Sequence, residues 1–197
     1  MKKILLIVLC ALVNFQVFCQ DNGDKKDAKL GVIAGYNLSD VKLNGSDGDA
    51  GDADGFYAGV LWEEQLIPLL RIQSGLKYIK NGWSYDNTGA NGKERAVLNY
   101  LMVPVAARLK IGPLYAIGGV YGAYRAGSKY KYKNGDEEKI STDEIKRWDF
   151  GANLGLGFQV AMIGIEARYN WGFTDMTPTA GDYYNRFLEI GLHLHLK

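Results

Sequence analysis

Hydrophobic and polar residues alternate along the second half of the chain. Apolar side chains occupy nearly every second position, and polar residues or glycines fill the positions between them. A period of two over about ten residues is the signal of a β-strand with two unlike faces. We predict eight such strands, at 30–40, 55–65, 70–83, 96–110, 114–126, 147–160, 163–173 and 184–196.

The connections between these segments alternate in length. Three are tight, around 66–68, 111–113 and 162, and four are long and polar, at 41–54, 84–95, 127–146 and 174–183. Short periplasmic turns and long extracellular loops are typical of bacterial outer-membrane barrels, and about ten residues suffice for a tilted strand to cross a bilayer. The pattern predicts an all-β fold, an eight-stranded antiparallel up-and-down transmembrane β-barrel.

A soluble barrel is the alternative, because its strands alternate too, with the apolar face inward. The two faces separate these classes. Gly and Asn dominate the polar face between Gly151 and Gly172, which suits a cramped lumen better than a hydrated surface. The apolar face carries six large aromatic residues, which fit a membrane-interface girdle and favour the membrane barrel. They are Trp62, Trp148, Phe158, Tyr169, Trp171 and Phe173.

The N-terminus has the three parts of an export signal. Lys2 and Lys3 precede an apolar run at 4–13, which is too short to span a bilayer. We predict a signal peptide at 1–19, a polar spacer at 20–29 and the barrel domain at 30–197. A lipoprotein with Cys19 as its lipidated residue is the alternative, but Phe18 stands where such signals want a small residue.

Composition excludes several classes. The chain has 23 basic and 22 acidic residues, a net charge of +1, so a general nucleic-acid binder is not expected. Its two cysteines both lie within 1–19 and cannot form a disulfide scaffold or a four-cysteine zinc site. We expect no cofactor.

Two motifs carry a family resemblance. The run 100–104 (YLMVP), followed by 108–119 (RLKIGPLYAIGG), and the run 148–151 (WDFG) with its later Gly-x-Gly resemble elements of the small outer-membrane β-barrel proteins of Bacteroidetes. These proteins are often called porin-family or PorT-like. The resemblance implies an outer-membrane barrel and brings no catalytic residues. It also makes Pro104 a shared feature. Since Pro104 lacks an N–H in the middle of a strand, we expect a β-bulge there.

The last strand resembles a second signal. Glu189, Gly191, Leu194 and Leu196 match the polar-x-Gly-x-x-apolar-x-apolar pattern that the barrel-assembly machinery reads. We therefore expect that machinery as a partner. An amphipathic strand with one glycine is the plain alternative.

The inferred lumen face carries the ionisable residues that we consider candidate site residues. We interpret them as a buried ion-pair network that fills a narrow lumen, and not as catalytic residues, since no Ser-His-Asp pattern appears. His193 and His195 share a face but lack an obvious third metal ligand. For Arg168 we expect Glu189, His193 or Asp149 as the partner. The set is Arg71, Lys77, Arg108, Asp149, Glu166, Arg168, Glu189, His193 and His195.

Two loops hold weaker candidates. Asp47, Asp49, Asp52 and Asp54 are spaced carboxylates of the kind that can bind Ca²⁺. The loop lacks the glutamate that an EF-hand places twelfth, so we favour a solvated acidic loop. The loop that begins at Lys129 is densely charged in both signs. Its cations can contact lipopolysaccharide phosphates, although a solvated loop is the simpler interpretation.

These observations favour a non-enzymatic outer-membrane barrel with a structural or recognition role through its extracellular loops. Porin-like passage of small solutes is the alternative, and a lipid-active enzyme is the third hypothesis. The expected partners are outer-membrane lipid and lipopolysaccharide, with no nucleic acid, and we expect a monomer.

Overall fold

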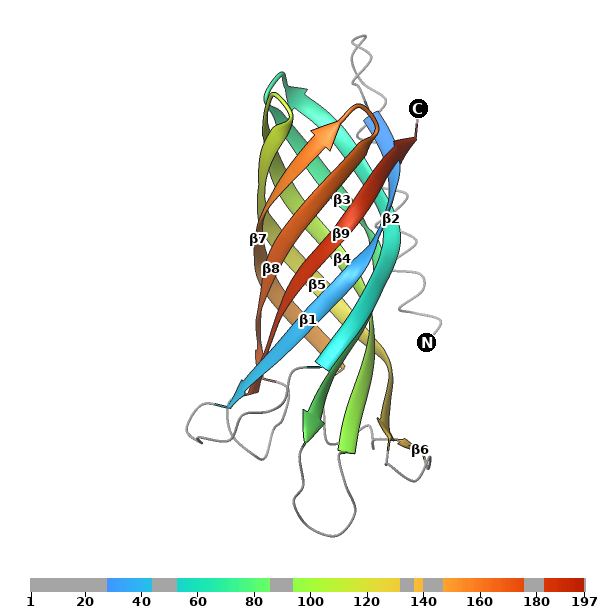
Figure 1. The fold of residues 1–197 in the computed structure, drawn as a ribbon. Helices are drawn as coiled ribbons and strands as arrows, with labels where there is room; N and C mark the ends of the chain where they lie inside the picture. The colour runs from blue at the N-terminus through green and yellow to red at the C-terminus, as the bar shows by residue number, and fades with distance from the viewer. Residues whose placement is uncertain are drawn as a thin grey trace, which may run out of the picture.

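Nine strands form one continuous sheet in the computed structural model, which describes residues 28–43, 53–85, 94–131, 137–139, 147–175 and 183–196 (Figure 1). Among these residues no helix is long and apolar enough to cross a membrane. The strands are β1 (Ala28–Leu43), β2 (Ala53–Ile67), β3 (Leu70–Tyr85), β4 (Glu94–Ile111), β5 (Leu114–Lys131), β6 (Glu137–Lys139), β7 (Trp148–Val160), β8 (Ile163–Asp175) and β9 (Tyr183–Leu196).

Eight long strands close into a barrel. Each pairs antiparallel with its neighbour in the chain, and β1 pairs with β9 to complete the circle. The predicted eight-stranded antiparallel barrel is confirmed. The short β6 was not predicted; it extends the sheet only at the end of β5, where three residue pairs form. β1 begins at Ala28, inside the predicted spacer, and the predicted signal peptide at 1–19 lies outside the described residues.

The strands are strongly tilted. Residues paired across successive strands, followed once around the barrel, do not lead back to their starting point. From Leu30 the path runs through Trp62, Ser74, Val105, Val120, Ala152, Trp171 and Arg186 and reaches β1 again at Asp40. This stagger, from residue 30 to residue 40, corresponds to a tilt of ~40° when the rise is ~3.3 Å and the strands are ~4.8 Å apart.

The outer face of the barrel is apolar. Along β7 the burial alternates residue by residue, with Leu154 and Leu156 exposed and Asn153 and Gly155 buried. Leu156 is 69% exposed and Phe173 is 66% exposed. Such a surface suits lipid and would aggregate in water, because large contiguous apolar patches are rare on soluble monomers.

The two ends of the barrel differ in the connections that they carry. Residues 68–69, 112–113 and 161–162 connect strands directly at one end, here called the turn end. Gly112 has a φ of 63°, a conformation that favours glycine in so tight a turn. The opposite end, here called the loop end, carries the connections whose residues are mostly outside the described part of the chain.

The expected bulge at Pro104 is wrong. The β3–β4 register is the same on both sides of it, since Ser74 pairs with Val105 and Lys77 with Met102, and Pro104 itself pairs with Tyr121. The proline removes one ladder hydrogen bond without adding a residue, so the register continues. The irregularity of β4 lies instead between Asn99 and Tyr100.

Candidate functional site in the barrel lumen

Eight of the nine candidate residues are buried inside the barrel. They are at most 3% exposed: Lys77, Arg108, Asp149, Glu166, Arg168, Glu189, His193 and His195. Arg71 is half-buried near the turn end, where its Nη2 donates to Gln65 Oε1 at 2.7 Å. The structure therefore brings most of the set into one lumen, but not into one cluster.

Arg168 on β8 is bound on two sides. Its Nε and Nη2 donate to Glu166 Oε1 at 3.0 and 2.7 Å, and Nη2 also donates to Gln73 Oε1 at 2.7 Å. Gln73 lies on β3, the strand directly opposite β8 in the closed circle. The side chain thus bridges the lumen. Of the expected partners, Glu189 lies directly opposite Arg168 in the β8–β9 ladder. The carboxylate that accepts the hydrogen bonds of Arg168 is Glu166, two residues away on the same strand face, because alternate residues of one strand point the same way.

A second bridge joins β3 to β9. Lys77 Nζ donates to Glu189 Oε2 at 2.7 Å, and both side chains are almost completely buried. The same ammonium lies 5.0 Å from the centroid of the Tyr57 ring. Glu189 lies opposite Arg168 in the β8–β9 ladder, as expected, but its hydrogen-bonded cation is Lys77.

Arg108 on β4 anchors the turn end of the lumen. Its Nη1 donates to Glu63, its Nη2 donates to Gln159 Oε1 at 2.8 Å, and its guanidinium carbon lies 3.5 Å from the centroid of the Tyr115 ring. His195 adds a contact to the same carboxylate, with Nε2 3.1 Å from Glu63 Oε1.

Three of the buried cations are therefore each matched by a carboxylate. Lys77, Arg108 and Arg168 contact Glu189, Glu63 and Glu166 respectively. Burying a charge is costly unless a partner and further hydrogen bonds satisfy it. Tyr115 supplies one of these bonds, donating its hydroxyl to Glu166 Oε2 at 2.9 Å. This arrangement, the lumen network, neutralises itself.

The two histidines belong to the lumen network. Their ring centroids are 4.9 Å apart. Tyr115 OH lies 3.5 Å from His193 Nδ1, and Gln159 Nε2 lies 3.3 Å from His195 Nδ1. Among the described residues no three His, Cys, Asp or Glu side chains gather into a group that suits a metal ion.

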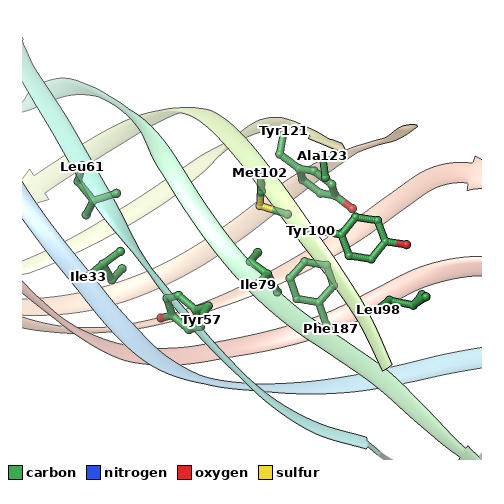
Figure 2. Packing of buried hydrophobic residues seen from close by; sticks show 10 residues of the cluster. All are labelled: Ile33, Tyr57, Leu61, Ile79, Leu98, Tyr100, Met102, Tyr121, Ala123 and Phe187. Carbon is green, nitrogen blue, oxygen red and sulfur yellow. The ribbon is translucent and has the colours of Figure 1, made fainter. Parts of the chain in front are cut away.

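Beyond the lumen network, the lumen is filled by apolar side chains (Figure 2). These side chains come from β1 to β5 and β9. The Tyr121 and Phe187 rings meet edge to face across the barrel at 6.3 Å between centroids. A polar lumen was expected throughout, so this part of the prediction is wrong. The apolar cluster comprises Ile33, Tyr57, Leu61, Ile79, Leu98, Tyr100, Met102, Tyr121, Ala123 and Phe187.

Toward the loop end, polar groups return. Asn37 on β1 donates to Asn81 on β3, the next strand but one, and Asn185 Nδ2 donates to Asp149 Oδ2 at 3.1 Å. Tyr121 OH lies 3.4 Å from the same carboxylate oxygen. Asp149 therefore belongs to this separate polar group and not to the network around Arg168.

Two tyrosines cover glycines of a neighbouring strand. A Cβ added at Gly157 would lie 2.1 Å from the Tyr115 ring, and one at Gly151 would lie 2.6 Å from the Tyr121 ring. Both pairs are directly opposed in the β5–β7 ladder. The inward glycines therefore make room for rings, which is a specific form of the expected fit of small residues in a narrow lumen.

The remaining candidates lie elsewhere. Asp47, Asp49 and Asp52 are outside the described residues, and Asp54 is placed only as a backbone position of β2, opposite Leu38. The four residues of the assembly signal lie on β9. Glu189 and Gly191 face the lumen, whereas Leu194 and Leu196 lie on the outer face, where they pair with Val32 and Leu30.

Several residues of the lumen network were missed by the sequence reasoning. Glu63, Gln73, Tyr115 and Gln159 all contact charged members of the network. The available signal was the alternation of their strands, which places these residues at positions whose side chains face the lumen. For Glu63 this signal was weakened because Glu64 follows it, so that a carboxylate falls on each face.

Sequence and structure comparisons agree with this fold. Residues 18–177 match the family model described as outer membrane protein beta-barrel domain. No curated protein matches the chain.

Two solved structures are similar in fold. The Ail attachment invasion locus protein of Yersinia pestis, crystallised with the heparin analogue sucrose octasulfate, has 16% identity and a TM-score of 0.52, over 86% of this chain and 99% of that one. Neisserial surface protein A has 14% identity and a TM-score of 0.58, over the same shares. A match over most of the chain, on a closed barrel with an apolar outer face, makes this protein a member of the outer membrane protein beta-barrel domain family, located in the outer membrane.

Proposed function

We propose that this protein is a non-enzymatic, closed outer-membrane barrel that acts as a structural and recognition element through its extracellular loops. The observation that carries the proposal is the filling of the lumen. Two side-chain bridges, Arg168–Gln73 and Lys77–Glu189, cross it, and the apolar cluster occupies the adjoining level.

The lumen network and the apolar cluster each oppose the passage of ions through the barrel, for different physical reasons. Eight strands enclose an interior that side chains can occupy completely. The three cations of the lumen network are each paired with a carboxylate, so this part of the described lumen offers an ion little unpaired charge. The apolar cluster opposes the passage of water and ions. Its side chains offer an ion no ligands that could replace the ion's hydration shell.

Recognition is assigned to the loops because the barrel itself offers lipid-facing and closed surfaces. The Ail barrel was crystallised with a sulfated sugar analogue. We extend surface recognition of this general kind to this chain as a proposal that rests on the shared fold. Further parts of it are a signal peptide at 1–19, assembly through the β9 signal, a monomeric state and kinship with the PorT-like barrels of Bacteroidetes.

Conductance in planar lipid bilayers tests the closed lumen. The purified full-length barrel should give no stable, reproducible current steps. An Arg168→Ala/Phe187→Ala variant, which removes one bridge and one cross-lumen ring, serves as a matched barrel with a loosened lumen and should leak more than the wild type. Reproducible wild-type steps would instead favour small-solute passage.

A further inference from the structure

The only two histidines of the chain, His193 and His195, lie side by side in the turn-end part of the lumen. They occupy successive inward positions of β9 and are 1% and 3% exposed. A histidine in water changes its charge near pH ~6.5, so its surroundings decide whether it is neutral in a folded protein. The hydrogen bonds around each ring indicate which of its nitrogens carries a proton.

Gln159 determines the polarity of the hydrogen bonds around His195. Arg108 Nη2 donates to Gln159 Oε1 at 2.8 Å, which leaves the amide nitrogen of Gln159 as a donor. That nitrogen lies 3.3 Å from His195 Nδ1, so Nδ1 accepts and carries no proton. Nε2 lies 3.1 Å from Glu63 Oε1 and therefore carries the ring proton. His195 is neutral, because a second proton on Nδ1 would face the N–H of Gln159.

Tyr115 determines the state of His193 in the same way. The tyrosine hydroxyl donates to Glu166 Oε2 at 2.9 Å, so its oxygen is left to accept. His193 Nδ1 lies 3.5 Å from that oxygen and carries the ring proton. Nε2 lies over Gly164, where an added Cβ would be 2.3 Å away, and has no hydrogen-bond partner among the described residues. A second proton there would be buried without an acceptor.

The charges around the two rings also favour the neutral forms. The lumen network matches three cations with three carboxylates, so a proton on either histidine adds a charge that no further carboxylate of this network balances. Arg71 lies directly opposite Arg108 in the β3–β4 ladder, and Lys110 Nζ lies 3.4 Å from Gln159 Oε1. Most of the charged groups around the rings are therefore cations. They are Lys29, Glu63, Arg71, Arg108, Lys110, Glu166 and Arg168.

We propose that the turn end of the lumen network is an acid-sensitive closure of the barrel, which requires both histidines to be neutral. A proton on His195 sets donor against donor at Gln159, and a proton on His193 buries an N–H without an acceptor. Either change loosens the contacts that hold Arg108 and Tyr115 in place. Short turns of outer-membrane barrels face the periplasm, so the closure responds to the pH on that side. The proposal rests on the closed lumen and adds a condition under which it opens.

The stability of the barrel should therefore fall as the pH falls. Below about pH 6.5 the unfolded chain takes up a proton on each histidine, whereas the folded barrel keeps both rings neutral. The unfolded state then binds more protons, and stability is lost toward acid. Between about pH 7.5 and about pH 5.5 this should raise the unfolding equilibrium constant roughly tenfold for each histidine, or about 100-fold for both.

Urea unfolding of the full-length barrel in lipid vesicles at these two pH values tests the proposal. His193→Asn/His195→Gln keeps an amide donor toward Tyr115 and Glu63 but cannot be protonated, so it should lose most of the acid effect. The matched control Asp149→Asn changes a lumen carboxylate at the loop end, leaves both histidines in place and should keep at least the wild-type acid effect. Heat-modifiable migration on gels checks that each variant is a folded barrel.

Histidine-selective ¹⁵N labelling of the wild type provides a second measurement, because the chain has only two histidines. At neutral pH the ring signals should show Nδ1–H for His193 and Nε2–H for His195. Three results would overturn the proposal: imidazolium signals from the folded barrel at neutral pH, equal unfolding at both pH values, or loss of the acid effect in Asp149→Asn. None of them bears on the closed lumen, which conductance at neutral pH tests separately.

Discussion

The two parts of the lumen solve the same packing problem in different ways. Toward the turn end, charged side chains fill the space and satisfy one another through the Arg108–Glu63 and Arg168–Glu166 pairs. The adjoining level is filled by the apolar cluster around Ile79 and Phe187. The charged part depends on complete sets of partners, whereas the apolar part depends on volume. A single truncation should therefore harm each for a different reason.

The largest expected effect comes from breaking a charged pair. Arg168→Ala leaves the Glu166 carboxylate buried without its cation and should lower the free energy of unfolding by ~3–5 kcal/mol. Urea unfolding in lipid vesicles measures it. Arg168→Met/Glu166→Gln removes both charges and should recover much of the loss. Additive single and double variants would mean that the site is hydrated, and the contrast between the two parts would disappear.

The matching change in the apolar cluster is Ile79→Ala. It leaves a cavity and should cost ~2–5 kcal/mol, while Ile79→Val should cost ~0.5–1.5 kcal/mol. The same urea titration applies. Unlike the charged pair, this loss should follow the volume removed, and no second truncation should restore it. Recovery by a further truncation of Phe187 would contradict this view.

Leu154→Arg extends the comparison to the lipid-facing surface. Leu154 is 58% exposed, and an arginine there should cost ~2–4 kcal/mol if the position lies near the bilayer midplane. In detergent micelles, which adapt around a charge, the cost should shrink. An equal cost in both media would indicate that the side chain packs against protein.

The smallest effect is expected at Asn153, a buried residue of β7. Both polar atoms of its side chain lack a hydrogen-bond partner among the described residues. Asn153→Leu should raise the free energy of unfolding by ~1 kcal/mol, because it removes an unsatisfied buried amide. Asn153→Asp should lower it, since the new charge has no cation bound to it. A destabilising Asn153→Leu would show that the amide is satisfied by water.

Regular alternation made the last three strands predictable. In β7 and β8, and in β9 from Leu188 onward, the inward positions are polar or glycine and most outward ones are apolar, so the period, the strands and the lipid-facing side all follow from the sequence. In β2 to β5 many inward residues are themselves apolar, such as Tyr57, Ile79 and Tyr100. Residues on both faces then look alike, so the apolar cluster was not foreseen.

Partners across the barrel depend on register, which alternation does not define. A shift of two residues keeps every side chain on its face but changes each neighbour. The expected neighbour Glu189 does lie opposite Arg168, but which of several inward carboxylates accepts its hydrogen bonds depends on side-chain positions that alternation does not give, and the acceptor is Glu166. The strand β6 escaped prediction because its three residues, Glu137 to Lys139, are all charged and have no apolar alternation.

The tyrosines that cover glycines also constrain how this sequence can change. A side chain at Gly157 meets the ring of Tyr115, so this glycine can be replaced only after the tyrosine has become smaller. At Gly151 an added Cβ would also lie 2.1 Å from the backbone oxygen of Trp171, so a smaller Tyr121 is not sufficient there. A smaller residue at Tyr115 in turn gives up the hydrogen bond to Glu166. The two substitutions of such a pair therefore depend on each other. The order in which they occur decides whether the intermediate sequence still folds into a stable barrel.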